Sequence, residues 1–358
     1  MGLYCILLLV PMLIQHIAVK EIHIDYHKRN KIALTFYFIF LTVMVMLRHE
    51  SVGNDTRNYI HIFEKYGWTE WDRLADVGLE IGYAYINKVI SLLSDNPQVF
   101  LALVAAAVSV MIYHTYKRLC VDASLTIVLY SILSTFPMMF SGIRQMLSIG
   151  MGFVAYEFVR RKKWIPFLVV VFLAVTVHVS AFMLVFMYPL YHSKITKKWL
   201  YIVVPAMAGV FALNRPIFAF LTAILSRFSR LEGIASSTGA YTMLILFVIF
   251  AFFAFLIPDD SRLDAEIIGL RNFLLLSLVI QMFAPLHVLA MRMNYYYIIF
   301  IPLLLPKIIQ CRSKRWNQVA VLARHVMLLF FLAYFFFNAY RGGSLNVFLY
   351  HFFWENVG

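Results

Sequence analysis

Charged residues are scarce in this chain of 358 residues, and hydrophobic residues are abundant. Asp, Glu, Lys and Arg together make up 14% of the sequence, whereas hydrophobic residues make up 62%. Soluble globular proteins have about a quarter of their residues charged and about half apolar, so that class is excluded. The chain therefore needs a lipid bilayer rather than water as its main solvent.

Cysteine is also scarce, and the motifs that mark common cofactor sites are missing. Cys5, Cys120 and Cys311 are far apart and form no disulfide framework, metal-ligand spacing or redox pair. The sequence contains no phosphate-binding glycine loop and no nucleophile elbow. We therefore expect neither a metal nor a cofactor.

Acidic residues are in the minority, and the formal net charge is +13. This charge does not indicate a nucleic-acid partner, because no soluble segment carries a basic stripe with interleaved aromatic residues. Lys and Arg collect instead in the cytoplasmic loops of membrane proteins, where they set orientation. Residues 1–19 contain no Lys or Arg, which favours a retained first helix over a cleaved signal peptide.

Apolar runs long enough to cross a hydrocarbon core of about 30 Å recur along the whole chain. They are solid apolar blocks rather than alternating patterns, so they predict helices. The expected spans are 3–19, 32–47, 98–116, 123–140, 142–159, 199–213, 240–257, 268–289, 294–310 and 325–340. We predict an all-α polytopic bundle of about ten spanning helices in a single integral membrane domain over 1–358.

Basic clusters set the expected orientation. Segments 20–31, 117–118, 160–163, 194–198 and 312–324 are rich in Lys and Arg and belong in the cytoplasm, which leaves both termini outside. We expect a bacterial inner (plasma) membrane protein. The basic residues left on the outer face are nearly all arginine, whose planar fork binds phosphate in a bidentate manner, so an outward anion site is indicated.

Four segments do not fit a simple span. The outer loop 48–80 is followed by 81–94, which is amphipathic, too short to cross and typical of an interfacial helix. A second outer loop covers 214–240. Segment 164–191 is either one long helix or a re-entrant hairpin that turns near His178. The hairpin is favoured because it keeps the lysines of 194–198 inside.

Five polar clusters lie against these apolar runs, at 48–59, 80–87, 141–145, 178–180 and 292–297. Polar groups at membrane depth are costly, so each is a functional candidate. Each also has a structural interpretation: a helix cap near Asp55, a favourable charge of Glu80 at a helix start, snorkelling of Arg144, a hydrogen-bonded His178, and an aromatic belt near Arg292. Together they predict an outward cavity in which arginines hold a lipid-linked diphosphate for group transfer.

At these positions the sequence resembles the EpsG family, which is grouped with Wzy-type polysaccharide polymerases. The pattern begins at Arg48 and continues as Val-Gly-Asn-Asp over 52–55 and Tyr59. Glu-Ile-Gly-Tyr at 80–83, Ser-Gly-Ile-Arg-Gln at 141–145, His-Val-Ser-Ala at 178–181 and Arg-Met-Asn-Tyr-Tyr at 292–296 follow in order. Ser141 stands where the family has Asn, which puts in doubt only whether an amide is essential there.

The resemblance implies a polymerase that acts on the periplasmic or outer face and needs no nucleotide sugar. It would transfer a growing glycan from undecaprenyl diphosphate to a new repeat unit linked to undecaprenyl diphosphate. The expected partners are this lipid-linked oligosaccharide as donor and acceptor, the bilayer, and a chain-length regulator protein, with no nucleic acid. The expected catalytic residues are His178, Asp55, Glu80, Arg144 and Arg292, and the expected substrate-binding residues are Arg48, Gly53, Tyr59, Gly82, Tyr83, Asn87, Gln145, Asn294, Tyr295 and Tyr296.

Two questions stay open at this level. His178, Asp55 and Glu80 are all candidates for the general base that takes the acceptor's proton. A lipid-linked oligosaccharide flippase or other transporter is the main alternative function, and it would need charged residues along a cavity that reaches both faces. An O-acyltransferase would explain His178 but not the outward arginines, and a scaffold would explain neither.

Overall fold

A computed structural model of the chain describes all residues except 17–24, 134, 226–238, 344 and 358. The described residues form helices and contain no β-strand, only two isolated bridges. The chain forms two compact units. Unit 1 comprises Met1–Val185 and Val321–Gly358, and unit 2 comprises Phe186–Ala320. The prediction of an all-α polytopic protein is confirmed.

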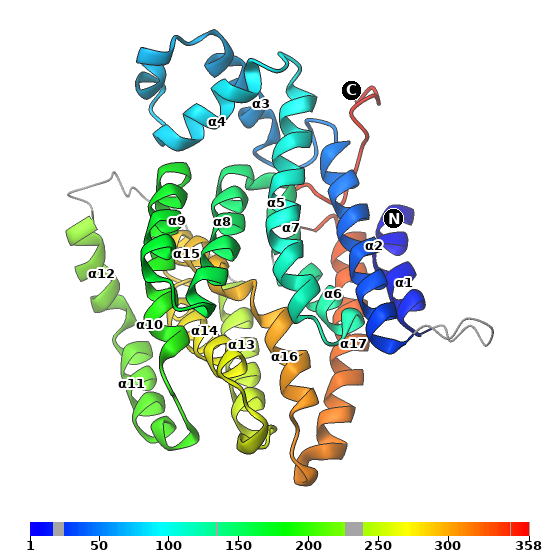
Figure 1. The fold of residues 1–358 in the computed structure, drawn as a ribbon, viewed down its shortest axis with the longest axis vertical. Coiled ribbons are helices and arrows are strands. Elements are labelled where there is room, and N and C mark those ends of the chain that lie inside the picture. The colour runs from blue at the N-terminus through cyan, green and yellow to red at the C-terminus, as the bar shows by residue number, and fades with distance from the viewer. Residues whose placement is uncertain (17–24, 134, 226–238, 344, 358) are drawn as a thin grey trace. The chain divides into compact units, whose positions relative to one another are not determined.

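Unit 1 is built around apolar helices (Figure 1). They are α1 (Gly2–His16), α2 (Tyr26–Met46), α5 (Pro97–Leu119), α6 (Ala123–Ile132), α7 (Thr135–Ser141), α8 (Ile143–Arg160), α9 (Trp164–Val177) and α17 (Asn317–Tyr340), which begins in unit 2. In hydrocarbon the backbone must satisfy its own hydrogen bonds, so apolar runs of this kind fold as helices. Buried aromatic rings of Tyr37, Phe38, Tyr116 and Tyr130 pack edge to face where α2, α5 and α6 meet.

Fewer helices are long enough to span a membrane than the hydropathy pattern predicts. By length and composition three qualify in the described part of the chain, at Tyr26–Met46, Pro97–Leu119 and Lys314–Tyr340. Up to six qualify if each bent pair is one span. The expected spans 123–140 and 294–310 are such pairs, bent by 58° and 45°. Hydropathy sums over a window and does not detect a bend, so it predicts each of these two pairs as one straight helix. The helix Gly2–His16, within the region of the expected span 3–19, is apolar but shorter than a candidate span.

The outer loop folds into short helices at one end of α5 (Figure 1). These are α3 (Thr56–Trp68), the 3-10 helix η1 (Trp71–Val77) and α4 (Ile81–Ser91). The polar side of α4 is buried against the protein through Tyr83, Ala84 and Asn87. Its opposite side, 81, 85, 89, 92 and 93, leaves large apolar side chains exposed. An exposed apolar face suits a helix at the membrane surface, and the interfacial position stays a prediction.

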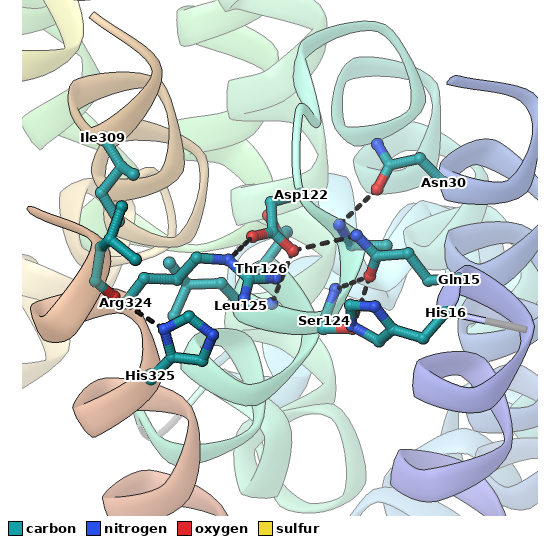
Figure 2. A network of polar contacts seen from close by, with 12 residues as sticks. Gln15, His16, Asn30, Asp122, Ser124, Leu125, Thr126, Ile309, Arg324 and His325 are labelled. Atoms are coloured by element: carbon teal, nitrogen blue, oxygen red, sulfur yellow. Dashed lines mark hydrogen bonds and ion pairs between the residues drawn. The ribbon is translucent and has the colours of Figure 1, made fainter. Parts of the chain in front are cut away.

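At the other end of unit 1, a network of hydrogen bonds around Asp122 holds the helices together (Figure 2). Asp122 caps α6 by accepting from the Leu125 amide, and it also accepts from Gln15 of α1 at 3.1 Å and from Arg324 of α17 at 2.6 Å. One carboxylate thus ties three helices together. Arg118 and its partner Glu157, 2.7 Å apart, also lie at the ends of α5 and α8 that point away from the outer loop. Residues predicted inside and outside therefore segregate to opposite ends of unit 1, and the side of the membrane stays a prediction.

The chain reverses direction at His178. Helix α9 ends there, and the 3-10 helix η2 (Val179–Phe186) follows. Thr176 lies against Gly82 of the outer loop region, whereas Leu184 packs against Gly152, eight residues further along α8 than Arg144. The chain thus approaches the outer end of unit 1 and turns back along α8. Whether this hairpin is re-entrant in a bilayer stays a prediction.

The C-terminal segment returns to the outer loop. The amide of His49 donates to the carbonyl of His351, and the amide of Gly53 donates to that of Asn346. Phe348 inserts between the rings of Tyr4 and Phe335. Two segments almost 300 residues apart by number are joined here, and hydropathy cannot foresee such a pairing.

Unit 2 has α14 as its central helix. It contains α10 (Met187–His192), η3 (Lys197–Trp199), α11 (Leu200–Ala212), α12 (Asn214–Leu225), α13 (Gly239–Leu256), η4 (Asp260–Arg262), α14 (Ala265–Gln281), α15 (Val288–Ile298), α16 (Ile301–Gln310) and η5 (Lys314–Trp316). Arg271 of α14 donates to the carbonyl of Ile195 and lies over the ring of Phe255. Of the expected outer loop 214–240, residues 226–238 lie outside the described residues.

Candidate functional site

Glu80 is the centre of the candidate site in unit 1. It stands at the N-cap of α4, but its side chain does not cap the helix. Its carboxylate instead accepts from Nη1 of Arg144 at 2.5 Å and from the amide of Val179 at 2.9 Å, and lies 3.3 Å from Nδ1 of His178. Three of the five predicted clusters therefore meet at one carboxylate. The side chains of Glu80, Arg144 and His178 are 21%, 22% and 11% exposed, so all three are mostly buried but partly accessible to solvent.

The surroundings of Glu80 keep its carboxylate ionised. Burial alone raises the pKa of Glu80, but the hydrogen bonds from His178 and Val179 and the charge of Arg144 outweigh it and lower the pKa to about 2. A carboxylate held in this way is a weak base at neutral pH. It is well suited to orient an imidazole and a guanidinium.

Arg144 reaches this site from the first turn of α8, which begins directly after Gly142. Its guanidinium lies 5.9 Å from the centre of the Tyr83 ring. The Nε atom of Arg144 is buried and has no hydrogen-bond partner among the residues that the structure describes. Arg144 therefore has a specific partner in Glu80, and whether it also snorkels to the interface stays untested.

His178 reaches the site because helix α9 ends at the point where α4 begins. Gly82 makes this approach possible, since a Cβ at its position would lie 2.3 Å from Oγ1 of Thr176 and 2.8 Å from its carbonyl oxygen. The predicted hydrogen-bonded histidine is present, with Glu80 as its partner. Nδ1 of His178 faces this carboxylate, which leaves Nε2 as the ring nitrogen that is able to exchange a proton with another group.

Asp55 and Ser141 form a second polar group in unit 1. Asp55 is at the N-cap of α3, as predicted, yet its side chain makes no capping bond. Oγ of Ser141 donates to Oδ2 of Asp55 at 3.4 Å and accepts from the Asp55 amide at 3.3 Å. The hydroxyl of Ser141 thus makes these two contacts with Asp55, at the position where the sequence comparison above has Asn in the family. Gly53 is needed for the turn, because its φ is +88° and a Cβ would lie 2.6 Å from the Phe140 carbonyl oxygen.

Arg48 lies inside the protein rather than on its outer surface. The residue is 1% exposed. It donates from Nη1 to the carbonyl of Val45 and from Nε to Oγ1 of Thr56 at 3.5 Å. These contacts join the end of α2 to the start of α3. The predicted substrate-binding role of Arg48 stays untested.

The remaining predicted ligands in unit 1 are mostly buried. Tyr59 and Tyr83 form an edge-to-face pair 6.2 Å apart, which connects the Asp55 loop to the Glu80 helix. Asn87 donates to the carbonyl of Tyr83 and is completely buried, and its Oδ1 has no partner. Gln145 is 4% exposed. These buried side chains pack against the residues of the site. That they contact the substrate stays a prediction.

Tyr66 is a buried residue that the sequence patterns missed and that interacts electrostatically with Arg144 and Glu80. It is fully buried in α3, and its hydroxyl has no partner. Burial raises the pKa of Tyr66, while the charges of Arg144 and Glu80 act on it in opposite directions. Tyr66 follows Tyr59 by seven residues, so both lie on the same face of α3. This spacing is the sequence signal that could have identified Tyr66. The Val179 amide also belongs to the site and has no sequence signal.

Arg292, Asn294, Tyr295 and Tyr296 belong to unit 2, on α15. Arg292 is exposed. Asn294 is buried and donates to the Ser277 carbonyl and to Gln281 Oε1, at 3.0 and 2.9 Å, so its amide nitrogen fastens α15 to α14. Tyr296 is 1% exposed. The predicted catalytic role of Arg292 is untested.

A family model described as the EpsG family matches residues 31–352 of the chain. This match includes all five clusters and both units. No curated protein and no solved structure matches the chain.

Proposed function

The chain belongs to the EpsG family of membrane proteins related to Wzy-like polysaccharide polymerases, and we propose that it polymerises lipid-linked glycan repeat units. The growing glycan leaves undecaprenyl diphosphate and is joined to a hydroxyl of a new repeat unit, itself linked to undecaprenyl diphosphate. The bond between the anomeric carbon and the donor diphosphate breaks, and the acceptor oxygen bonds to that carbon. A base takes the hydroxyl proton, and undecaprenyl diphosphate is released.

The observation that supports this proposal is the convergence of Arg144, His178 and Glu80 from separate segments. In a glycosyl transfer of this kind, negative charge grows on the leaving diphosphate and positive charge on the base. A guanidinium and an imidazole beside one carboxylate match these two demands. Preorganised charges of this type lower the barrier because they need no rearrangement during the reaction.

Arg144 is assigned to the leaving diphosphate. Glu80 occupies only one terminal nitrogen of Arg144, and the side chain is 22% exposed. Arg144 therefore retains donors for a phosphate oxygen while Glu80 and Tyr83 fix its position.

His178 is assigned as the general base, and Glu80 as the residue that orients it. The pKa of Glu80, lowered to about 2, leaves this carboxylate little tendency to accept a proton. It stabilises instead the imidazolium that forms when Nε2 of His178 takes the acceptor proton. Asp55, bonded to Ser141, is assigned to the orientation of sugar hydroxyls.

The test is extension of a purified lipid-linked repeat unit by the purified protein in liposomes without nucleotide sugars. We expect longer lipid-linked glycans and one released undecaprenyl diphosphate for each unit added. Translocation of the repeat unit across the liposome membrane without extension would refute the polymerase and favour the flippase. Arg144→Gln should abolish extension, and Arg57→Gln is the control, because Arg57 is an exposed arginine paired with Glu50 rather than with Glu80.

The site is proposed to face the periplasm or exterior of a bacterial inner membrane. Asp72→Cys, in the outer loop, should react in whole cells with a thiol reagent that cannot cross the membrane, and Thr196→Cys should not. Labelling at position 196 alone would show that the orientation of the protein is opposite to the proposed one. Labelling at both positions would show that segment 164–191 crosses the membrane once.

A further inference from the structure

The turn between α8 and α9 carries three consecutive cations, Arg-Lys-Lys at 161–163, and all three residues are exposed. The carboxylate nearest to them in the sequence belongs to Glu157, and it is already occupied. One of its oxygens pairs with Arg118 at 2.7 Å and the other with Arg160 at 3.1 Å. In the described part of the chain no carboxylate pairs with the side chains of 161–163. The turn therefore presents three positive charges that the protein itself does not neutralise.

The backbone holds these charges close together. The amide of Lys162 donates to the carbonyl of Val159 at 3.0 Å, and the amide of Lys163 donates to that of Phe158 at 2.9 Å. This pair of bonds closes the end of α8 in an arrangement that usually has glycine at the position of Lys162. Lys162 has a φ of +55°, which is unfavourable for a residue with a Cβ. Three like charges thus share one tight turn, and a bound anion would reduce their mutual repulsion.

Helix α9 continues from this turn with two different sides. One side is buried, through Phe167, Val171 and Ala174, and α9 packs against α8. The other side is apolar and 44–68% exposed, and it consists of Trp164, Ile165, Leu168, Val169, Phe172 and Leu173. A tryptophan at the boundary between charge and apolar surface is typical of the headgroup level of a bilayer. A cationic turn and an apolar stripe therefore adjoin on one helix.

A ligand that matches both parts has an anionic head and apolar chains. A free phosphate ion would use only the turn, and an acidic protein segment would leave the apolar side of α9 uncovered. We propose that the turn 161–163 and the exposed side of α9 bind an anionic phospholipid, with its phosphate on the cations and its acyl chains along α9. This site is separate from the polymerase chemistry, and it does not depend on which side of the membrane the turn lies.

The experiment measures lipid binding to the purified protein in neutral detergent by native mass spectrometry. The probes are phosphatidylglycerol, which is anionic, and phosphatidylethanolamine with the same acyl chains, which is neutral overall. We expect phosphatidylglycerol to bind at least about tenfold more tightly, and this preference to shrink with added salt because the charges are screened. Replacing all three residues of the turn (Arg161→Gln, Lys162→Gln and Lys163→Gln together) should remove the preference.

A control variant removes the same amount of charge elsewhere. Arg57→Gln, Lys65→Gln and Arg73→Gln together neutralise three exposed cations of the outer loop, and the preference should remain. Lys162→Gly covers the case in which the triple variant of the turn fails to fold. Glycine accepts a φ of +55° without strain, so the thermal unfolding midpoint should not fall, while the affinity for phosphatidylglycerol should fall several-fold.

Two results would overturn the proposal. One is equal affinity of the wild-type protein for the two lipids. The other is a preference for phosphatidylglycerol that persists unchanged in the triple variant of the turn and in Lys162→Gly. Soluble glycerol phosphate is a further probe, and we expect it to bind much more weakly than phosphatidylglycerol because it has no acyl chains. Equal binding of the two would contradict the assigned role of the apolar side of α9.

Discussion

The pairing of Glu80 with Arg144 gives the sharpest energetic prediction. Glu80→Gln removes the charge but retains a side chain of similar shape, and Arg144→Gln removes the opposite charge. Together with the double variant they form a cycle that isolates the coupling between the two side chains. The wild-type contact is 2.5 Å between Nη1 and Oε2.

The expected coupling is intermediate between that of an exposed and that of a buried ion pair. Exposed pairs contribute about 0.2–1 kcal/mol, and breaking a buried pair costs about 3–5 kcal/mol. With side chains 22% and 21% exposed, we expect a coupling of about 1–2 kcal/mol. The pKa of Glu80, lowered from 4.5 to about 2, corresponds to a net stabilisation of the carboxylate by about 3 kcal/mol, after its partners have offset the cost of burial.

The assay is denaturant unfolding in detergent micelles, followed by tryptophan fluorescence. Glu50 and Arg57 supply a control cycle, because their side chains are 39% and 64% exposed at a contact distance of 3.0 Å. We expect less than about 0.5 kcal/mol there. A Glu80–Arg144 coupling no larger than that of the control would refute the argument that partial burial strengthens this pair.

The same pair predicts a dependence on pH. The folded-state pKa of Glu80 is lowered to about 2, below its ordinary value of 4.5. Its contribution to stability is therefore fully present above pH 4.5 and is lost as the pH falls towards about 2. Glu80→Gln should flatten this part of the stability profile, and an unchanged slope would contradict the assigned shift.

Three further predictions concern residues of the same unit. Gly53→Ala should strongly reduce stability, because the φ of Gly53 is +88° and the added Cβ would clash with the Phe140 carbonyl. Gly78→Ala is the control in the same unfolding assay. Gly78 has a φ of +84° but open space around it, so the substitution should cost only about 1–2 kcal/mol of backbone strain. Arg144→Lys should lower the rate of glycan extension by about 10²–10³ at normal protein level, because the bidentate fork is lost, and full polymer length in cells would argue against the assignment. His178→Gln should lower kcat by about 10²–10⁴ with little change in KM, whereas a normal kcat would make His178 structural.

Local sequence patterns determined the class of protein and most of the candidate residues. A bilayer forces apolar runs into helices whatever their neighbours are, so the all-α membrane architecture follows from hydropathy alone. The cost of polar groups at membrane depth likewise marked Glu80, Arg144 and His178 without any knowledge of the fold. The amphipathic pattern of 81–94 also corresponds to a helix, α4, with one apolar side exposed.

Only the tertiary structure decided which of these residues meet. Glu80 and Arg144 are 64 positions apart, and Glu80 and His178 are 98 apart, so their contact depends on the end of α9, the start of α8 and the absence of a side chain at Gly82. The burial of Arg48, the bends within two expected spans and the return of the C-terminal segment to the outer loop are decided in the same way. Hydropathy and motif spacing are local properties, whereas these features arise from packing between segments that are distant in the chain.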